Sequence, residues 1–295
     1  MSSEVAVKPP RASAGVQDAR ADTRMASLRA IYIIWYRDIL RYWRDRWRLV
    51  ASLAQPLLFL IVFGSGLSSS LKGSASFGAG GLSYIQFMYP GIIGMAILFT
   101  AIFGAMSIVW DREFGFLKEV LVAPIDRSSV AIGKALGGTT QAMIQGLILL
   151  ILAPFVGVKL SPLTVLTMIP LAAVLAFGLS SFGVALASTM KSMQGFQVVM
   201  NFLMMPMFFL SGALFPLSGL PGWMTLLTRI DPASYGIDPL RRVVLSDSGL
   251  PTAVIDKLGL TINGQVLSIP LEAGIMLAFG VVMLAFAVMS FKRRD

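Results

Sequence analysis

Six long stretches without a charged residue divide the chain. The first two lie between Arg48 and Lys72 and between Lys72 and Asp111, and the last ends at Lys292. Each can hold the roughly 20 apolar residues that cross a bilayer as a helix. We therefore predict an all-α polytopic membrane protein with six transmembrane helices in one domain, residues 49–295. The predicted spans lie near residues 49–68, 89–110, 136–157, 163–188, 197–216 and 272–291.

The first 48 residues follow a different pattern. Residues 1–25 contain no apolar run and lack the hydrophobic core of a signal peptide, so we expect a disordered tail. Over residues 26–48, apolar side chains recur at helical spacing and arginines take the opposite side. This pattern predicts an amphipathic helix in the membrane interface with its arginines on anionic lipid; the alternative is a solvated helix packed on another subunit. The apolar set is Leu28, Ile31, Tyr32, Trp35, Ile39 and Tyr42.

Proline and glycine interrupt the stretch between the fifth and sixth spans, residues 217–271. Its apolar part before Arg229 is too broken for a full span, and it predicts short re-entrant helices that dip into the outer leaflet. Farther on, Asn263-Gly264 stands between Ile262 and Val266, which predicts a small β-hairpin.

Composition agrees with a membrane protein and excludes much chemistry. The chain is 56% hydrophobic and 13% charged, where soluble domains carry about 25% charge. It has no cysteine and no histidine, which excludes thiolate or imidazole metal sites, cysteine nucleophiles and histidine-based triads. We find no credible catalytic constellation and expect no bound metal and no enzymatic activity of the chain's own.

The distribution of the basic residues indicates how the chain is oriented in the membrane. There are 24 Lys and Arg against 15 Asp and Glu. With both termini in the cytoplasm, most of the basic residues fall on the cytoplasmic side, as the positive-inside rule requires. The excess of positive charge therefore calls for no nucleic acid.

The predicted spans hold no ionisable side chain. Their polar candidates are Gln55, Gln141, Gln145, Gln197 and Asn201. Proton-driven transporters need a titratable group at depth, so a self-sufficient proton antiporter is disfavoured. A P-loop is also absent, so ATP would have to be bound by a partner chain.

The connection between spans two and three, residues 111–127, mixes charge with apolar surface. Phe114, Leu117 and Leu121 share one helical face, and Pro124 ends the helix. A short amphipathic element of this kind can dock into a groove on a soluble partner and carry its movement to the spans. The alternative is an interfacial turn that only joins two spans.

Two sets of residues carry a resemblance to a known family. The first set is Arg112-Glu113, Gly115, Leu121, Pro124, Arg127 and Gly133-Lys134. The second set is Ser211-Gly212, Phe215-Pro216, Pro221, Trp223, Asp231-Pro232, Tyr235, Asp238 and Arg241. Together they resemble the permease subunits of type 2 ATP-binding-cassette exporters, particularly the daunorubicin-resistance and nodulation-export branch. Phe116 and Lys118 depart from the pattern, because many relatives have Thr and an acid there.

The resemblance implies a permease dimer, of identical or related copies, in a prokaryotic cytoplasmic membrane. Two separate ATPase subunits would bind ATP and Mg, and Glu113 would pair with a basic residue on one of them. The expected coupling residues are Arg112, Glu113, Phe114, Gly115, Leu117, Lys118, Leu121 and Pro124. An outer gate or re-entrant support is expected at Pro216, Trp223, Pro232, Tyr235, Asp238 and Arg241. For the last three, a local hydrogen-bonded cap is the alternative.

The fifth span is crowded with methionine and phenylalanine, adaptable side chains that could line a pathway for bulky apolar cargo. The candidate pathway residues are Asn201, Met204, Met205 and Phe208. A drug, polyketide, glycolipid or lipid-linked saccharide would fit, and packing against core or lipid is the alternative. An ATP-independent channel or facilitator is the competing function. A membrane-embedded transferase would need an acid/base cluster that the scattered external carboxylates do not offer.

Overall fold

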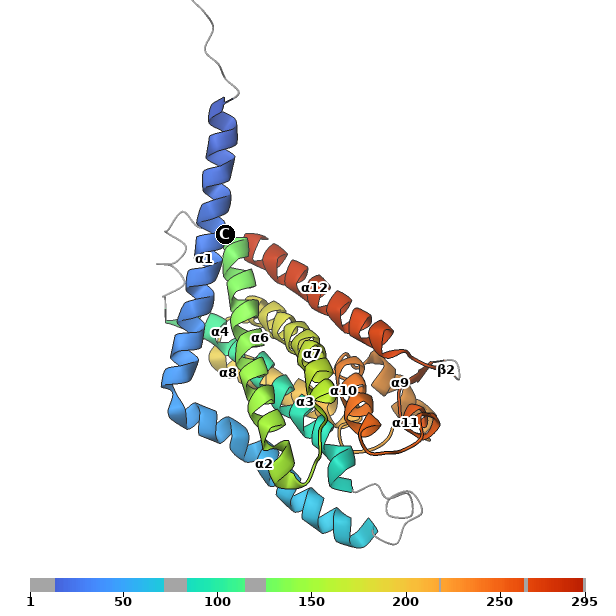
Figure 1. Ribbon diagram of the computed structural model, residues 1–295. Coiled ribbons are helices and arrows are strands. Elements are labelled where there is room, and N and C mark those ends of the chain that lie inside the picture. The colour runs from blue at the N-terminus through green and yellow to red at the C-terminus, as the bar shows by residue number, and fades with distance from the viewer. Residues whose placement is uncertain (1–13, 72–83, 115–125, 218, 263–264, 294–295) are drawn as a thin grey trace, which may run out of the picture.

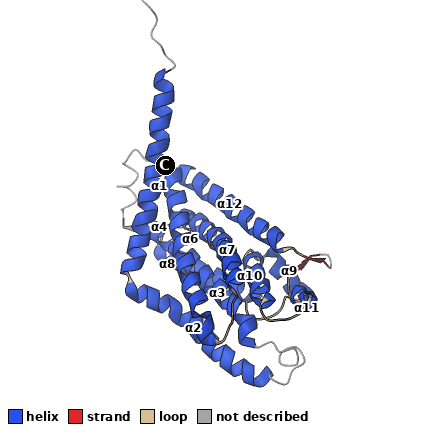
Figure 2. Ribbon diagram, in the orientation of Figure 1, coloured by secondary structure: helices blue, strands red, loops and turns tan. Residues whose placement is uncertain are grey.

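The computed structural model describes residues 14–71, 84–114, 126–217, 219–262 and 265–293, and nearly all of this chain is helical (Figure 2). The long helices are α1 (Ala14–Arg44), α2 (Arg46–Leu71), α3 (Tyr84–Gly104), α6 (Arg127–Leu152), α7 (Pro162–Thr189), α8 (Met193–Leu210) and α12 (Ile269–Arg293). The short elements are α4 (Met106–Glu113), the 3-10 turn η1 (Ala153–Val156), α9 (Gly222–Ile230), α10 (Ser234–Ser246), α11 (Thr252–Lys257), β1 (Thr261–Ile262) and β2 (Gln265–Val266).

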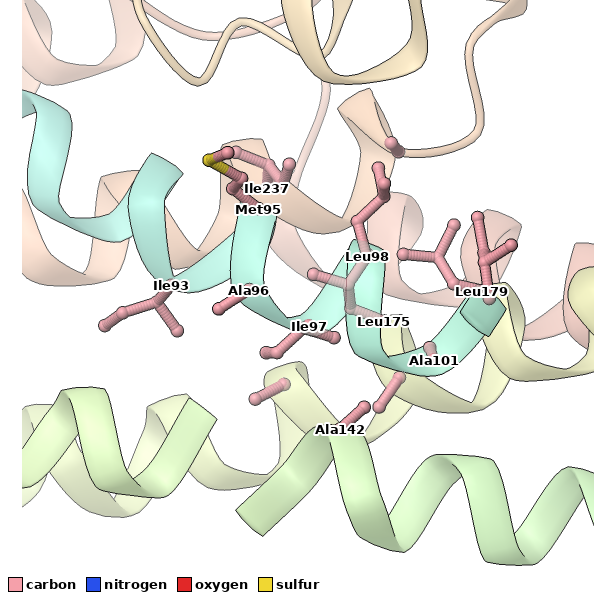
Figure 3. Packing of buried hydrophobic residues seen from close by; sticks show 14 of the residues in the cluster. Ile93, Met95, Ala96, Ile97, Leu98, Ala101, Ala142, Leu175, Leu179 and Ile237 are labelled. Carbon is pink, nitrogen blue, oxygen red and sulfur yellow. The ribbon is translucent and has the colours of Figure 1, made fainter. Parts of the chain in front are cut away.

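Helix α3 is the centre of the core. Its side chains meet α6, α7 and α10, as Figure 3 shows for Ile97 beside Ala142 and for Leu98 near Leu175. Close approach depends on small residues, as is common between membrane helices. A Cβ atom on Gly91 would lie 2.2 Å from the carbonyl oxygen of Ala213, so only glycine fits there.

Among the described residues, five helical stretches are long and apolar enough to cross a membrane, namely 84–113, 127–156, 162–189, 193–210 and 269–292. They confirm an all-α polytopic membrane protein. The predicted span at 49–68 lies in α2, which qualifies only together with α1, across a 70° bend. Two glycines and four serines near the end of α2 lower its hydropathy. The fifth predicted span is shorter than expected, because α8 ends at Leu210 before Gly212, which has a φ of 76°.

Helix α1 differs from the expected interfacial helix in extent and in packing. It starts at Ala14, so it includes residues 14–25, where we expected no regular structure; alanine and arginine in this segment favour a helix. Residues 1–13 lie outside the described residues. The helix ends at Arg44 and packs along α6 of the same chain. Its buried stripe has a spacing of four and consists of Ala30, Ile34, Asp38 and Tyr42.

The elements between α8 and α12 gather at the end of the bundle opposite α1 and the C-terminus (Figure 1). Strands β1 and β2 pair antiparallel, with Thr261 opposite Val266, which confirms the predicted hairpin. Helix α10 is almost completely buried and packs on α3, α7 and α12. It is thus part of the core of the bundle, and its depth relative to the membrane stays a prediction.

Candidate functional site

Three consecutive residues end helix α4 and reach different helices. We call Asp111, Arg112 and Glu113 the α4 junction. A break at Ala105, where the backbone N–H bonds to Ile102 three residues back, separates α4 from α3. The junction therefore stands at the start of the predicted coupling segment, on an element distinct from the core helix α3.

Asp111 belongs to a buried ion cluster that joins α1, α4 and α6. The ammonium of Lys134, on α6, lies 3.1 Å from Asp38 Oδ1 and 3.1 Å from Asp111 Oδ2, and it donates to Ser107 Oγ at 2.9 Å. The side chain of Lys134 is only 2% exposed. Its three donors thus meet three acceptors, which offsets the cost of burying the charge.

Two arginines of α1 complete this cluster. Arg37 Nη2 lies 3.2 Å from Asp111 Oδ2, and Arg41 Nη1 lies 4.0 Å from Asp111 Oδ1. Both arginines are partly exposed, so their contribution is screened by solvent. We define the buried ion cluster as Arg37, Asp38, Arg41, Asp111 and Lys134.

Arg112 caps the end of α7. Its guanidinium donates to the backbone carbonyls of Ser188, at 3.2 Å, and of Met190, and it lies 3.4 Å from the carbonyl oxygen of Ala187. The last carbonyls of a helix have no partner within the helix and carry partial negative charge. A guanidinium there satisfies the carbonyls and matches that charge.

Glu113 caps the start of the next helix, α8. Its Oε2 accepts the backbone N–H of Met193, the first residue of α8, at 2.8 Å. Two residues later in the same turn, the N–H of Gly195 donates to Ser192 Oγ at 3.2 Å. A carboxylate at a helix N-terminus is favourable because the free N–H groups carry partial positive charge. Arg112 and Glu113 together therefore hold the turn between α7 and α8.

The structure describes only part of the predicted coupling segment. Phe114 is exposed, and its ring lies 5.2 Å from that of Trp110. Gly115, Leu117, Lys118, Leu121 and Pro124 lie outside the described residues. Beyond them, Asp126 caps α6 by accepting the N–H of Ser128 at 3.2 Å. Hydrogen bonds from Ser128 lower the pKa of the Asp126 carboxyl, so the cap stays charged at neutral pH.

The predicted spans were drawn without ionisable side chains, but the helices of the structure extend past their bounds. Lys134, just before the predicted span 136–157, lies inside α6, and Glu272, at the first position of the predicted sixth span, lies inside α12; both are buried. Charge gaps mark where spans begin, but a paired charge can lie within a helix when its neighbours supply partners. The available signal in the sequence was that a basic residue, Lys134, and an acidic residue, Glu272, each stand at the start of a predicted span.

Two of the polar candidates in the spans hold the corner between α1 and α2. Gln145 Oε1 accepts from the hydroxyls of Tyr42 at 3.2 Å and Ser52 at 3.1 Å, while Gln141 Nε2 donates to the carbonyl of Asp38 at 3.3 Å. Trp35 also donates to Thr140, at 3.0 Å. These amides of α6 therefore have a structural role.

A second polar group surrounds α10. The hydroxyl of Tyr235 donates to the carbonyl of Arg229 at 2.7 Å, and Asp238 Oδ2 accepts the N–H of Leu260 at 3.0 Å. Arg241 is completely buried, donates to the carbonyl of Gly212, and lies 4.8 Å from the ring centroid of Phe87.

These contacts are of the kind that a local hydrogen-bonded cap would make at Tyr235, Asp238 and Arg241, and the outer gate stays a prediction. The other three predicted residues of that set lie apart from the cap. Trp223 is 66% exposed on α9, while Pro216 and Pro232 are half-buried at the ends of turns.

Sequence reasoning missed the ion pairs that complete this cap. Arg242 lies 3.1 Å from Glu272 Oε1, 3.5 Å from Asp238 Oδ2 and 3.7 Å from Asp256 Oδ1. It links α10 to the first turn of α12. The spacing of Asp238 and Arg242, four residues apart on a helix, was the available signal. Within the described ranges, no three carboxylates come close enough to hold a metal ion.

The predicted pathway residues of α8 divide between two faces. Met204 and Phe208 are buried, and the ring of Phe208 lies 5.8 Å from that of Phe59 on α2 and 6.4 Å from that of Phe99 on α3. Asn201 and Met205 are exposed on the other face. The structure thus does not bring these four side chains together.

Comparison with known proteins identifies the family. Residues 29–245 match the family model described as ABC-2 type transporter. The putative transport permease ycf38 of Cyanophora paradoxa is 30% identical over 72% of this chain and 73% of its own length. Nodulation protein J of Rhizobium meliloti is 26% identical over 72% and 80%, and the inner membrane transport permease YadH of Escherichia coli is 29% identical over 75% and 85%. With its apolar helices, this chain belongs to the ABC-2 type transporter family as a multi-pass transport permease.

Proposed function

We propose that this permease is the membrane-spanning subunit of an ATP-driven exporter that moves a hydrophobic or amphipathic cargo out of the cell. A separate ATPase subunit binds ATP and Mg and powers the cycle. Two permease copies pair in the cytoplasmic membrane, with both termini in the cytoplasm. On this orientation, α1, the α4 junction and the C-terminus face the ATPase.

The α4 junction is the observation that carries the proposal. A movement imposed on the segment after Glu113 reaches α7 and α8 through the two caps, and reaches α1 and α6 through Asp111. Three adjacent side chains thus connect four helices. Such a connection suits a segment that receives motion from a partner, because packed helices shift as rigid bodies.

The junction changes the role expected for Glu113. An ion pair with the ATPase was the expectation, whereas Glu113 Oε2 already accepts the N–H of Met193. Glu113 is also exposed, so its second carboxylate oxygen can meet a basic residue of the partner. We propose that Glu113 links the ATPase to α8 through its two oxygens.

Purification of the tagged chain from mild detergent tests the proposal. We expect a stoichiometric ATP-binding-cassette subunit in the eluate, and ATPase activity that Glu113→Arg lowers while the permease stays folded. Lys191→Gln is the matched control, because Lys191 is an exposed charge in the same α7–α8 turn. Unchanged activity of Glu113→Arg contradicts the coupling role. The competing channel function is established if the chain purifies without any such subunit and conducts solute in liposomes without ATP.

A further inference from the structure

A cavity of about 400 Å³ lies between the α1–α2 corner and α3. This volume falls within the range of small-molecule sites. On α3 it is lined by one helical face that includes Ala96, Phe99 and Phe103, and Met106 continues this face at the start of α4. On α2 it is lined by Ala51, Ser52, Gln55 and Pro56. Three aromatic and two methionine side chains are among the lining residues, as in pockets that adapt to bulky apolar ligands.

Two polar side chains in this cavity lack a partner in the described part of the chain. The carboxamide of Gln55 and the hydroxyl of Thr100 line the cavity, and neither makes a side-chain hydrogen bond to another described residue. By contrast, the other polar lining groups, Tyr42 and Ser52, already donate to Gln145. Gln55 therefore differs from Gln141 and Gln145, whose amides hold the helix corner.

The backbone of α2 adds an acceptor without its usual helical donor at the same place. Pro56 lies inside the helix and has no N–H, so the carbonyl oxygen of Ser52, four residues earlier, loses its helical donor. An unpaired polar group away from water is costly, and a bound ligand relieves that cost. The cavity thus offers hydrogen-bonding groups within apolar walls, and none of its lining residues is charged.

We propose that this cavity binds the cargo, and that the cargo is an uncharged amphipathic molecule. Its neutral hydrogen-bonding group, an amide, ester or hydroxyl, pairs with Gln55 and Thr100, while its apolar body packs on Phe99 and Phe103. The ring of Phe99 also lies 6.4 Å from that of Phe208 on α8, so the cavity adjoins a predicted pathway residue whose ring neighbours include residues of both α2 and α3. This inference rests on the proposed transport function and specifies its substrate class.

A binding measurement on the full-length permease in nanodiscs tests the site without the ATPase. The probe is N-dodecyl dansylamide, which joins an alkyl chain to an uncharged sulfonamide, and its fluorescence reports saturable binding. We expect Gln55→Leu and Thr100→Val each to weaken binding about two- to tenfold, the effect of one lost hydrogen bond. Gln197→Leu is the matched control, because Gln197 is an exposed amide of α8 that does not line the cavity. It should leave the affinity unchanged.

A second variant keeps the test decisive if either polar substitution disturbs folding. Ala51 is exposed and lines the cavity, so Ala51→Trp fills it without displacing a buried side chain. We expect Ala51→Trp to abolish saturable binding and to abolish probe stimulation of the ATPase in the assembled complex. Wild-type affinity in Gln55→Leu, Thr100→Val and Ala51→Trp overturns the site, even if the ATPase still co-purifies. Failure of the ATPase to co-purify, by contrast, overturns the exporter proposal. It does not affect the binding measurement, which uses the permease alone.

Discussion

Arg112 and Glu113 are neighbours in the chain, and they cap opposite ends of two successive helices. Arg112 donates to the last carbonyls of α7, and Glu113 accepts the first N–H of α8. Each charge has the sign that its helix terminus favours. The pair holds the turn at residues 190–192 and ties it to the end of α4.

Removal of the Arg112 cap should loosen this turn. Arg112→Gln loses most of the donors to the carbonyls of Ser188 and Met190, and we expect a loss of about 1–3 kcal/mol of stability. Glu113→Gln keeps an acceptor but loses the charge at the α8 terminus, which is worth about 0.3–1 kcal/mol. The apparent melting temperature of the purified chain measures both. Lys191→Gln serves as the control, and an equal drop in that variant would argue against a specific cap.

The buried ion cluster should be intolerant of a single charge removal. Lys134→Met leaves Asp38 and Asp111 buried without their shared partner, which costs about 3–5 kcal/mol in comparable sites. We expect a large fall in melting temperature and in yield. Combining Lys134→Met with Asp38→Asn and Asp111→Asn should recover much of the loss, because the two buried carboxylates that Lys134 neutralised are then gone. Lys159→Met, at an exposed position, is the control.

The charge gaps were enough to place most spans, because a run of apolar residues between charges has few stable solutions in lipid. The gap from Lys159 to Lys191 predicted a span near 163–188, and α7 runs from Pro162 to Thr189. The hairpin followed from Asn263-Gly264 in the same local way. Features that depend on one segment alone were therefore predictable.

The contacts between distant segments were not predictable in this way. The sequence pattern predicts no role for Asp38, and Asp38 is buried because α1 packs along α6 at Gly137, where there is no side chain to exclude it. One partner of Lys134, Asp38, is 96 residues away in the chain. Arg112 and Glu113 were identified as important, but their acceptor and donor lie beyond residue 186 and could not be read from their own neighbourhood.

Close helix contact at Gly91 gives a prediction about packing. A Cβ atom there would meet the Ala213 backbone at 2.2–2.8 Å, and backbone cannot move aside cheaply. We expect Gly91→Ala to destabilise the chain by roughly 1–3 kcal/mol, the usual cost of overpacking. Gly66→Ala is the matched control, because a Cβ at Gly66 meets nothing within 4 Å. Thermal unfolding of the two variants should therefore differ clearly in the same detergent.

Asp231, between α9 and α10, gives a pH dependence with a defined sign. Burial raises the pKa of its carboxyl to about 7, against the hydrogen bonds from Ala233 and Ser234 that lower it. The folded state then binds a proton that the unfolded state has already lost, so stability falls as the pH rises from about 4 to about 7. The slope reaches at most about 1.4 kcal/mol per pH unit.

The melting temperature measured between pH 4.5 and 7.5 checks this slope, with Asp231→Asn as the comparison. The asparagine keeps an acceptor for the N–H of Ala233 but cannot titrate, so its profile should be flatter than that of the wild type over the same range. Asp126→Asn, at an exposed cap whose carboxyl pKa is lowered, should leave the wild-type slope in place. Parallel profiles for the wild type and Asp231→Asn would mean that another group carries the pH dependence.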